Sequence, residues 1–105
     1  MTEKRIVLTT IGSKEAAQKM AQALVTRHLA ACVNIVGPVE SVYWWKGKVE
    51  SAGEYVLLIK TMADSLDNLY KAVRELHTYE LAEFAVLTVE SGSREYLQWI
   101  EGCVR

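Results

Sequence analysis

The sequence has little of what would direct a protein to an oxidising compartment, a membrane or a nucleic acid. Its two cysteines, Cys32 and Cys103, stand far apart without C-x-x-C spacing, which favours free thiols over a disulfide or a zinc site. Twelve basic against thirteen acidic residues give no field that attracts nucleic acid. No apolar run approaches membrane-spanning length, and the run after Met1–Arg5 stops at Leu8, too short for a signal peptide. We therefore expect a cytoplasmic protein with neither nucleic-acid nor membrane partners.

Catalytic motifs are also missing. There is no phosphate-binding glycine loop, no G-x-S-x-G and no H-E-x-x-H in the sequence. A Cys32–His77 nucleophile pair is the one alternative. A thiol buried in a strand without a nearby cation stays protonated and unreactive, however. We therefore expect a protein that is not an enzyme.

The hydrophobic patterns predict one domain over residues 1–105 with two helices against a sheet. The expected elements are a strand at 6–10, a helix from 14 to about 29, a strand at 31–43, a return strand at 49–59 that pauses at 51–53, a helix from 66 capped by Asp64 or Ser65, a strand at 84–89, and a last helix capped by Ser93. This β-α-β-β-α-β order with a C-terminal helix predicts an α+β, ferredoxin-like architecture.

The two middle strands form a long hairpin that bends at Gly37-Pro38 and turns at Lys46-Gly47. Because neighbouring side chains on a strand point to opposite faces, Trp44 and Trp45 cannot both enter the core of their own domain. A hairpin longer than its sheet also exposes unpaired edges. We therefore expect a small cyclic oligomer with strand pairing between copies and with Tyr43, Trp44 and Trp45 at the interface. Base stacking on RNA is disfavoured, since no basic residues alternate with these aromatics.

Several blocks of the sequence, in order and spacing, are similar to the CutA family of divalent-cation tolerance proteins. The blocks are Ala31–Ile35, Ser41–Lys48, Lys60–Thr61, His77–Glu80 with Glu83, and Tyr96–Trp99. The resemblance implies a ferredoxin-like homotrimer, similar in architecture to the PII signalling proteins, with a role in tolerance of copper and other divalent metals. Unlike PII proteins, this chain has too short a turn at Lys46-Gly47 for a target-docking loop.

The resemblance also implies a set of residues in the clefts between subunits. They are Cys32, Trp45, Lys60, His77, Tyr79 and Glu80. His77, Cys32 and Glu80 carry ligand types that bind a borderline divalent ion such as copper. In the alternative, His77 stabilises the end of its helix by bonding to the last carbonyl groups. Lys60 either binds an anion, pairs with Glu54 or Glu80, or forms a salt bridge at the rim of an interface.

Two functions of different class remain open at this stage. The first is a non-catalytic homotrimer that weakly binds a metal ion or a small effector between its subunits, with no cofactor required. The second is a structural or adaptor trimer for a partner protein, with no metal site.

Overall fold

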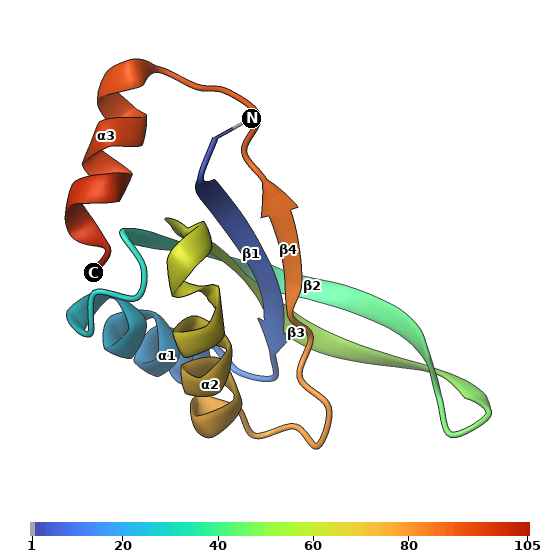
Figure 1. Cartoon of the computed structure of the whole chain (residues 1–105). Helices are drawn as coiled ribbons and strands as arrows, with labels where there is room; N and C mark the ends of the chain where they lie inside the picture. Colours follow the sequence, from blue (N-terminus) through green and yellow to red (C-terminus); the bar gives the residue numbers. More distant parts are fainter. Residues whose placement is uncertain (1) are drawn as a thin grey trace.

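The computed structural model describes residues 2–105, which form one antiparallel sheet and three α-helices (Figure 1). The elements are β1 (Lys4–Ile11), α1 (Lys14–Thr26), β2 (Cys32–Trp45), β3 (Lys48–Met62), a 3-10 turn (Ala63–Ser65), α2 (Leu66–Leu76), β4 (Ala85–Thr88) and α3 (Arg94–Cys103). The strand order is β2-β3-β1-β4, and every pair is antiparallel. This confirms the predicted ferredoxin-like fold. No helix within residues 2–105 is long and apolar enough to cross a membrane.

One face of the sheet packs against α1 and α2 and forms the core. Alternate residues of the two central strands point to this side, because side chains on a strand alternate between faces. The fully buried members are Val7 and Ile11 of β1, Leu57 and Ile59 of β3, and Ala17, Leu24, Leu69 and Val73 of the helices. Ser13 caps the N-terminus of α1, as its position predicts, because its hydroxyl accepts a hydrogen bond from the Ala16 amide.

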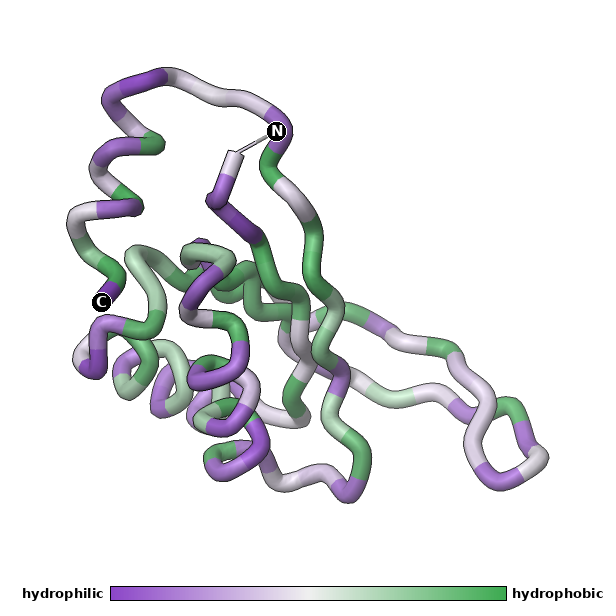
Figure 2. Tube along the Cα trace, viewed as in Figure 1, coloured by the Kyte–Doolittle hydropathy of each residue, from purple (hydrophilic) through white to green (hydrophobic). Residues whose placement is uncertain are grey.

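The opposite face of the sheet is not covered by α1 or α2, and we call it the open face. The register of the strands assigns to it the apolar residues Ile6, Leu8, Val36, Val56, Leu58, Ala85 and Leu87, with the polar residues Thr10, Asn34 and Lys60 among them. Only one end meets a helix, where Met62 packs against α3 and Lys4 forms a 2.9 Å ion pair with Glu101. Figure 2 shows that β4 is largely hydrophobic, whereas the projecting part of the hairpin mixes hydrophobic and hydrophilic residues. The chain therefore exposes a broad apolar surface on one side.

The β2–β3 hairpin projects beyond the sheet and gives the molecule dimensions of 44 × 25 × 23 Å (Figure 1). At its tip, Lys46 and Gly47 have φ angles of 49° and 80°, so both residues of the two-residue turn are left-handed. This is the turn geometry that matches the twist of paired strands. The register shifts between Val36 and Val39, around Gly37-Pro38. The predicted bend, turn and long hairpin are confirmed.

The predicted pause in the return strand is wrong. Ser51, Ala52 and Gly53 have weak strand preference, but they pair in register with Val42, Ser41 and Glu40 of β2. The β3 strand is therefore continuous from Lys48 to Met62. Pairing with a long partner strand outweighs the local preference of three residues.

The first helix ends three residues earlier than predicted. His28 has a φ of 60° and donates its amide to the Val25 carbonyl, while the Leu29 amide donates to Leu24, both at 3.0 Å. These two bonds form a Schellman motif, which usually has glycine at the left-handed position. The sequence has histidine and not glycine at this position, so the apolar pattern alone extends the predicted helix to about Leu29.

Candidate functional site

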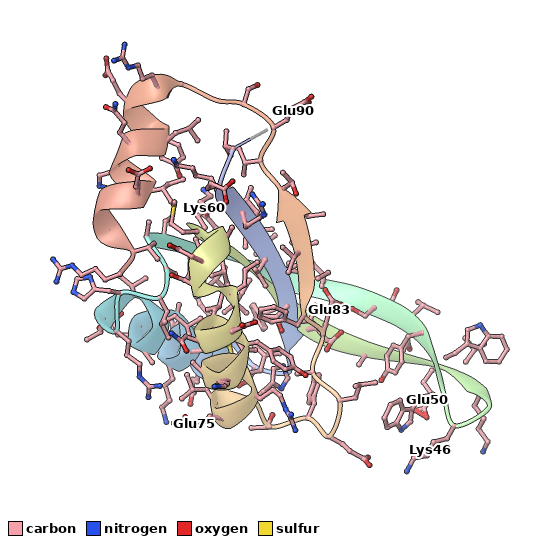
Figure 3. The ribbon with its side chains drawn as sticks, in the orientation of Figure 1. Lys46, Glu50, Lys60, Glu75, Glu83 and Glu90 are labelled. Carbon is pink, nitrogen blue, oxygen red and sulfur yellow. The ribbon has the colours of Figure 1, made fainter. Side chains whose placement is uncertain are left out.

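The main cavity in the described part of the chain is an open groove of about 1000 Å³ between the hairpin and the segment 79–83. We call it the acidic groove. It is lined by the carboxylates of Glu50, Glu54, Glu80 and Glu83, by the rings of Tyr43, Trp44, Trp45 and Tyr79, and by small or aliphatic residues. Figure 3 shows Glu50 out on the hairpin and Glu83 close to the sheet. Within residues 2–105, no lysine, arginine or histidine is among the lining residues.

Two lining residues of this groove, Tyr79 and Glu54, are joined by a hydrogen bond. The Tyr79 hydroxyl donates to Oε2 of Glu54 at 2.8 Å, and Glu54 is only 7% exposed. Gly12 leaves room for the phenol, because a Cβ there would lie 3.1 Å from the hydroxyl oxygen. Burial and then the bond to Glu54 raise the pKa of Tyr79 to about 12. Tyr79 is therefore a persistent proton donor at neutral pH.

Stability at alkaline pH is expected to depend on Tyr79. Below pH 10.0 both states keep the phenol proton, whereas between 10.0 and about 12 the unfolded chain loses it first, so stability falls as pH rises. Urea unfolding across this range should show a smaller loss for Tyr79→Phe than for the unaltered chain. Tyr70→Phe, on the exposed side of α2, serves as the control. Equal pH profiles for Tyr79→Phe and the unaltered chain would contradict this role.

His77 follows the last residue of α2 and has both ring nitrogens in hydrogen bonds. Nε2 donates to the Thr10 carbonyl of β1, and Nδ1 accepts from the Tyr79 amide at 3.0 Å. The neutral ring, protonated at Nε2, satisfies both bonds. The ring also lies 4.6 Å from that of Tyr79, centroid to centroid. His77 thus positions Tyr79 against the sheet, and it must give up one bond before it can coordinate a metal ion.

Lys60 and Cys32 lie at a different place, near α3 (Lys60 is labelled in Figure 3). They face each other across β2 and β3, and the Lys60 ammonium lies 5.8 Å from the ring centroid of Tyr96. Within residues 2–105 Lys60 has no ion-pair partner, so it pairs with neither Glu54 nor Glu80 in a single copy. The contact with Tyr96 was not predicted, because α3 reaches Lys60 only through the tertiary fold.

In one copy the six candidate cleft residues therefore divide between two places. Trp45, Tyr79 and Glu80 line the acidic groove, with His77 bonded to Tyr79 beside it. Cys32 and Lys60 lie at the other end of the sheet, since six residues of strand separate Lys60 from Glu54, or about 20 Å. Among residues 2–105 no three His, Cys, Asp or Glu side chains converge as a metal site. Three carboxylate residues of the groove, Glu50, Glu54 and Glu83, are not among the six candidates.

Comparison with known proteins identifies the family of this chain. The model of the CutA1 divalent ion tolerance protein family matches residues 5–103. The chain is 41% identical over 100 residues to rice "Protein CutA 1, chloroplastic", and 42% identical over 97 residues to the Thermus thermophilus "Divalent-cation tolerance protein CutA". The matches cover 95% and 92% of this chain, but 56% of the rice protein and 94% of the Thermus protein.

Solved structures agree with the family match. The Thermus thermophilus Cut A1 protein superposes with a TM-score of 0.95 at 40% identity, over 97% of this chain and 99% of that one. CutA from Xylella fastidiosa gives a TM-score of 0.96 at 33% identity, over 99% and 100%. The fold, the hairpin and the sequence blocks together lead to one assignment: this chain belongs to the CutA1 divalent ion tolerance protein family.

Proposed function

We propose that the chain acts as a non-catalytic homotrimer in divalent-metal tolerance and weakly binds a metal ion, such as copper, or a small effector at clefts between its subunits. The observation that carries the proposal is the open face. Monomeric proteins rarely leave a large continuous apolar surface in water. Leu87 on this face is 48% exposed, beside Ile6 of the neighbouring strand. A second copy of the chain is the simplest cover for it.

The hairpin supports the same assembly. Val42, Trp44 and Val49 near its tip are strongly exposed, and Trp44, which pairs with Val49, is 74% exposed. The outer edges of β2 and β4 also have no strand beside them in the sheet formed by residues 2–105. If β2 of one copy meets β4 of the next, each contact uses two different surfaces and can close into a ring. Three copies is the number that the family resemblance implies.

The geometry of His77 favours the second candidate, a structural or adaptor trimer without a metal site. Both ring nitrogens are already bonded within the chain. Coordination would also have to bring in ligands from another copy, because no three potential ligands converge among residues 2–105. The two hydrogen bonds of His77 and the lack of a third nearby ligand within residues 2–105 allow weak but not tight metal binding in one copy.

Metal titration separates the two functions. Light scattering should first give about three times the chain mass of 11.8 kDa. Copper and zinc are then titrated by calorimetry into the unaltered chain, His77→Ala and His28→Ala. Removal of a metal ligand should weaken binding by at least about tenfold in His77→Ala. His28→Ala, whose ring bonds to the Cys103 carbonyl, should leave it unchanged. Equal binding by all three proteins would rule out a His77 site and favour the adaptor.

A further inference from the structure

We propose that α3 is a strap that opens and closes as one unit, and that His28 is the latch that holds its end against the rest of the chain. The strap goes beyond the proposed function, because it requires neither a metal ion nor an effector. Figure 1 shows α3 apart from α2, joined to β4 by the connection 89–93. The C-terminal end of α3 lies beside the end of α1, where His28 is found.

The apolar contacts of α3 are separate from the main core. Of residues 94–103, only Ile100 is buried, and it packs with Ala31 and Val104 in a small cluster. The partly buried residues around this cluster, none of which belongs to the core formed with α1 and α2, are Met62, Leu97 and Cys103. A helix of ten residues is marginal by itself in water. Because segments with few buried contacts open at a lower free energy than a core does, α3 can open while the sheet stays folded.

The connection before α3 provides the hinge. The sheet holds the chain as far as Val89, whose amide donates to the Lys4 carbonyl at 3.1 Å and whose carbonyl accepts from the Thr2 amide at 3.2 Å. Within residues 2–105, no backbone hydrogen bond of a turn or loop involves residues 90–92, and all three are exposed. Rotation about these residues therefore breaks no bond of the sheet.

The latch consists of two hydrogen bonds between His28 and the end of α3. The ring Nδ1 of His28 donates to the Cys103 carbonyl at 3.1 Å, and the His28 carbonyl accepts from the Arg105 amide at 3.0 Å. Since a carbonyl only accepts, Nδ1 carries the proton in the first bond. The last carbonyl groups of a helix have no partner within the helix. The imidazole of His28 therefore caps α3 from outside.

The backbone of His28 separates this role from that of ending α1. Its φ of 60° is left-handed, a conformation that favours glycine. The Schellman motif at the end of α1 uses only backbone groups, so glycine would form it with less strain than histidine does. The contact of the ring with α3 offsets that strain. Replacing His28 by glycine should therefore favour the end of α1 and loosen α3, two effects of opposite sign.

The closed strap covers the end of the sheet that carries Lys60. The Tyr96 ring centroid lies 5.8 Å from the Lys60 ammonium, and Met62 packs against the small cluster. The ion pair between Lys4 and Glu101 adds little to closure, because the Glu101 side chain is 65% exposed. Opening of α3 uncovers Met62 and releases the Lys60 ammonium from Tyr96. The latch thus controls access to one residue of the candidate cleft.

Hydrogen exchange of the full chain, followed by mass spectrometry of its peptides, tests the strap. In the unaltered protein the bonded amides of α3 should exchange at least about tenfold faster than those of α2, after correction for intrinsic rates. His28→Gly should raise exchange in α3 by a further factor of about three to ten, the effect of losing one hydrogen bond. Amides of α1 and α2 should stay as protected as before, or become more so.

Two further variants serve as controls, each checked for folding by circular dichroism at the same concentration. Arg27→Ala changes the neighbouring residue, whose guanidinium lies 3.8 Å from Glu75 of α2, and should leave exchange in α3 unchanged. Ile100→Ala removes the buried anchor and should raise exchange in α3 at least about tenfold while α2 stays protected. Exchange in His28→Gly no faster than in the unaltered chain would overturn the latch. Equal protection of α3 and α2 in the unaltered protein, or unfolding of the whole chain in Ile100→Ala, would overturn the strap.

Discussion

The Leu87→Glu variant is expected to remain a single copy at micromolar concentration, whereas the proposed homotrimer predicts about three times the chain mass of 11.8 kDa for the unaltered chain. Leu87 lies on the open face, paired with Ile6 of β1. Assembly through this face would bury the introduced carboxylate without a partner, at a cost of several kcal/mol. In a separate copy the same side chain stays half-exposed, so the fold is kept. Sedimentation velocity over a range of concentrations measures the change.

Val25→Glu is the matched control for this variant. Val25 is 40% exposed, similar to Leu87, but it lies on α1 on the other side of the molecule. It should assemble like the unaltered chain, with an unchanged circular dichroism spectrum. If Leu87→Glu still forms trimers, the open face is not the interface. A Val25→Glu variant that dissociates would point instead to a general effect of added negative charge.

Leu24→Ala is expected to lower the free energy of unfolding by about 2–5 kcal/mol, because it opens a cavity in a fully buried part of the core. Leu24 packs between α1 and the sheet and also accepts the capping bond from the Leu29 amide through its carbonyl. The substitution leaves that backbone bond in place, so the loss measures side-chain packing. Urea unfolding at a fixed protein concentration is the measurement, since stability linked to assembly varies with concentration.

The adjacent Val25→Ala change provides the comparison. It also shortens an aliphatic side chain on α1, but at an exposed position, where substitutions usually change stability by less than about 0.5 kcal/mol. Similar losses in both variants would mean that the core is not where the structure places it. A loss in Leu24→Ala well below 2 kcal/mol would show that the helix can move to fill the cavity.

The elements that sequence reasoning identified correctly are those with local signals. The stripe from Leu66 to His77 predicts α2, which ends one residue earlier at Leu76, and Lys46-Gly47 predicts the turn, because both depend on residues close together in the chain. The predicted pause at residues 51–53 and the predicted end of α1 were wrong for two different reasons. Strand pairing with the distant β2 keeps residues 51–53 in the strand. The end of α1 is set locally, by the left-handed conformation of His28.

The candidate site was harder to predict because it is formed by distant segments. Tyr79 was named from its motif, but its partner Glu54 lies 25 residues earlier in the chain. Only the β3 register and the course of the segment after α2 bring the two together. For Lys60 the sequence left open an anion, Glu54 or Glu80, or a salt bridge at the rim of an interface. Within one copy it lies over Tyr96, because α3 returns to the end of the sheet. Single-residue roles follow from chemistry, whereas pairings between segments need the fold.

The projecting hairpin also matters for a newly synthesised chain. In a single copy, its apolar tip and the edge of β2, which has no neighbouring strand within residues 2–105, are accessible to proteases, chaperones and unrelated strands. For the trimer that we propose, encounter with sister chains would compete with degradation and aggregation, and the balance would shift with the rate of synthesis. Slow production would therefore yield less assembled protein per chain made than rapid production, even though every chain has the same stability once folded.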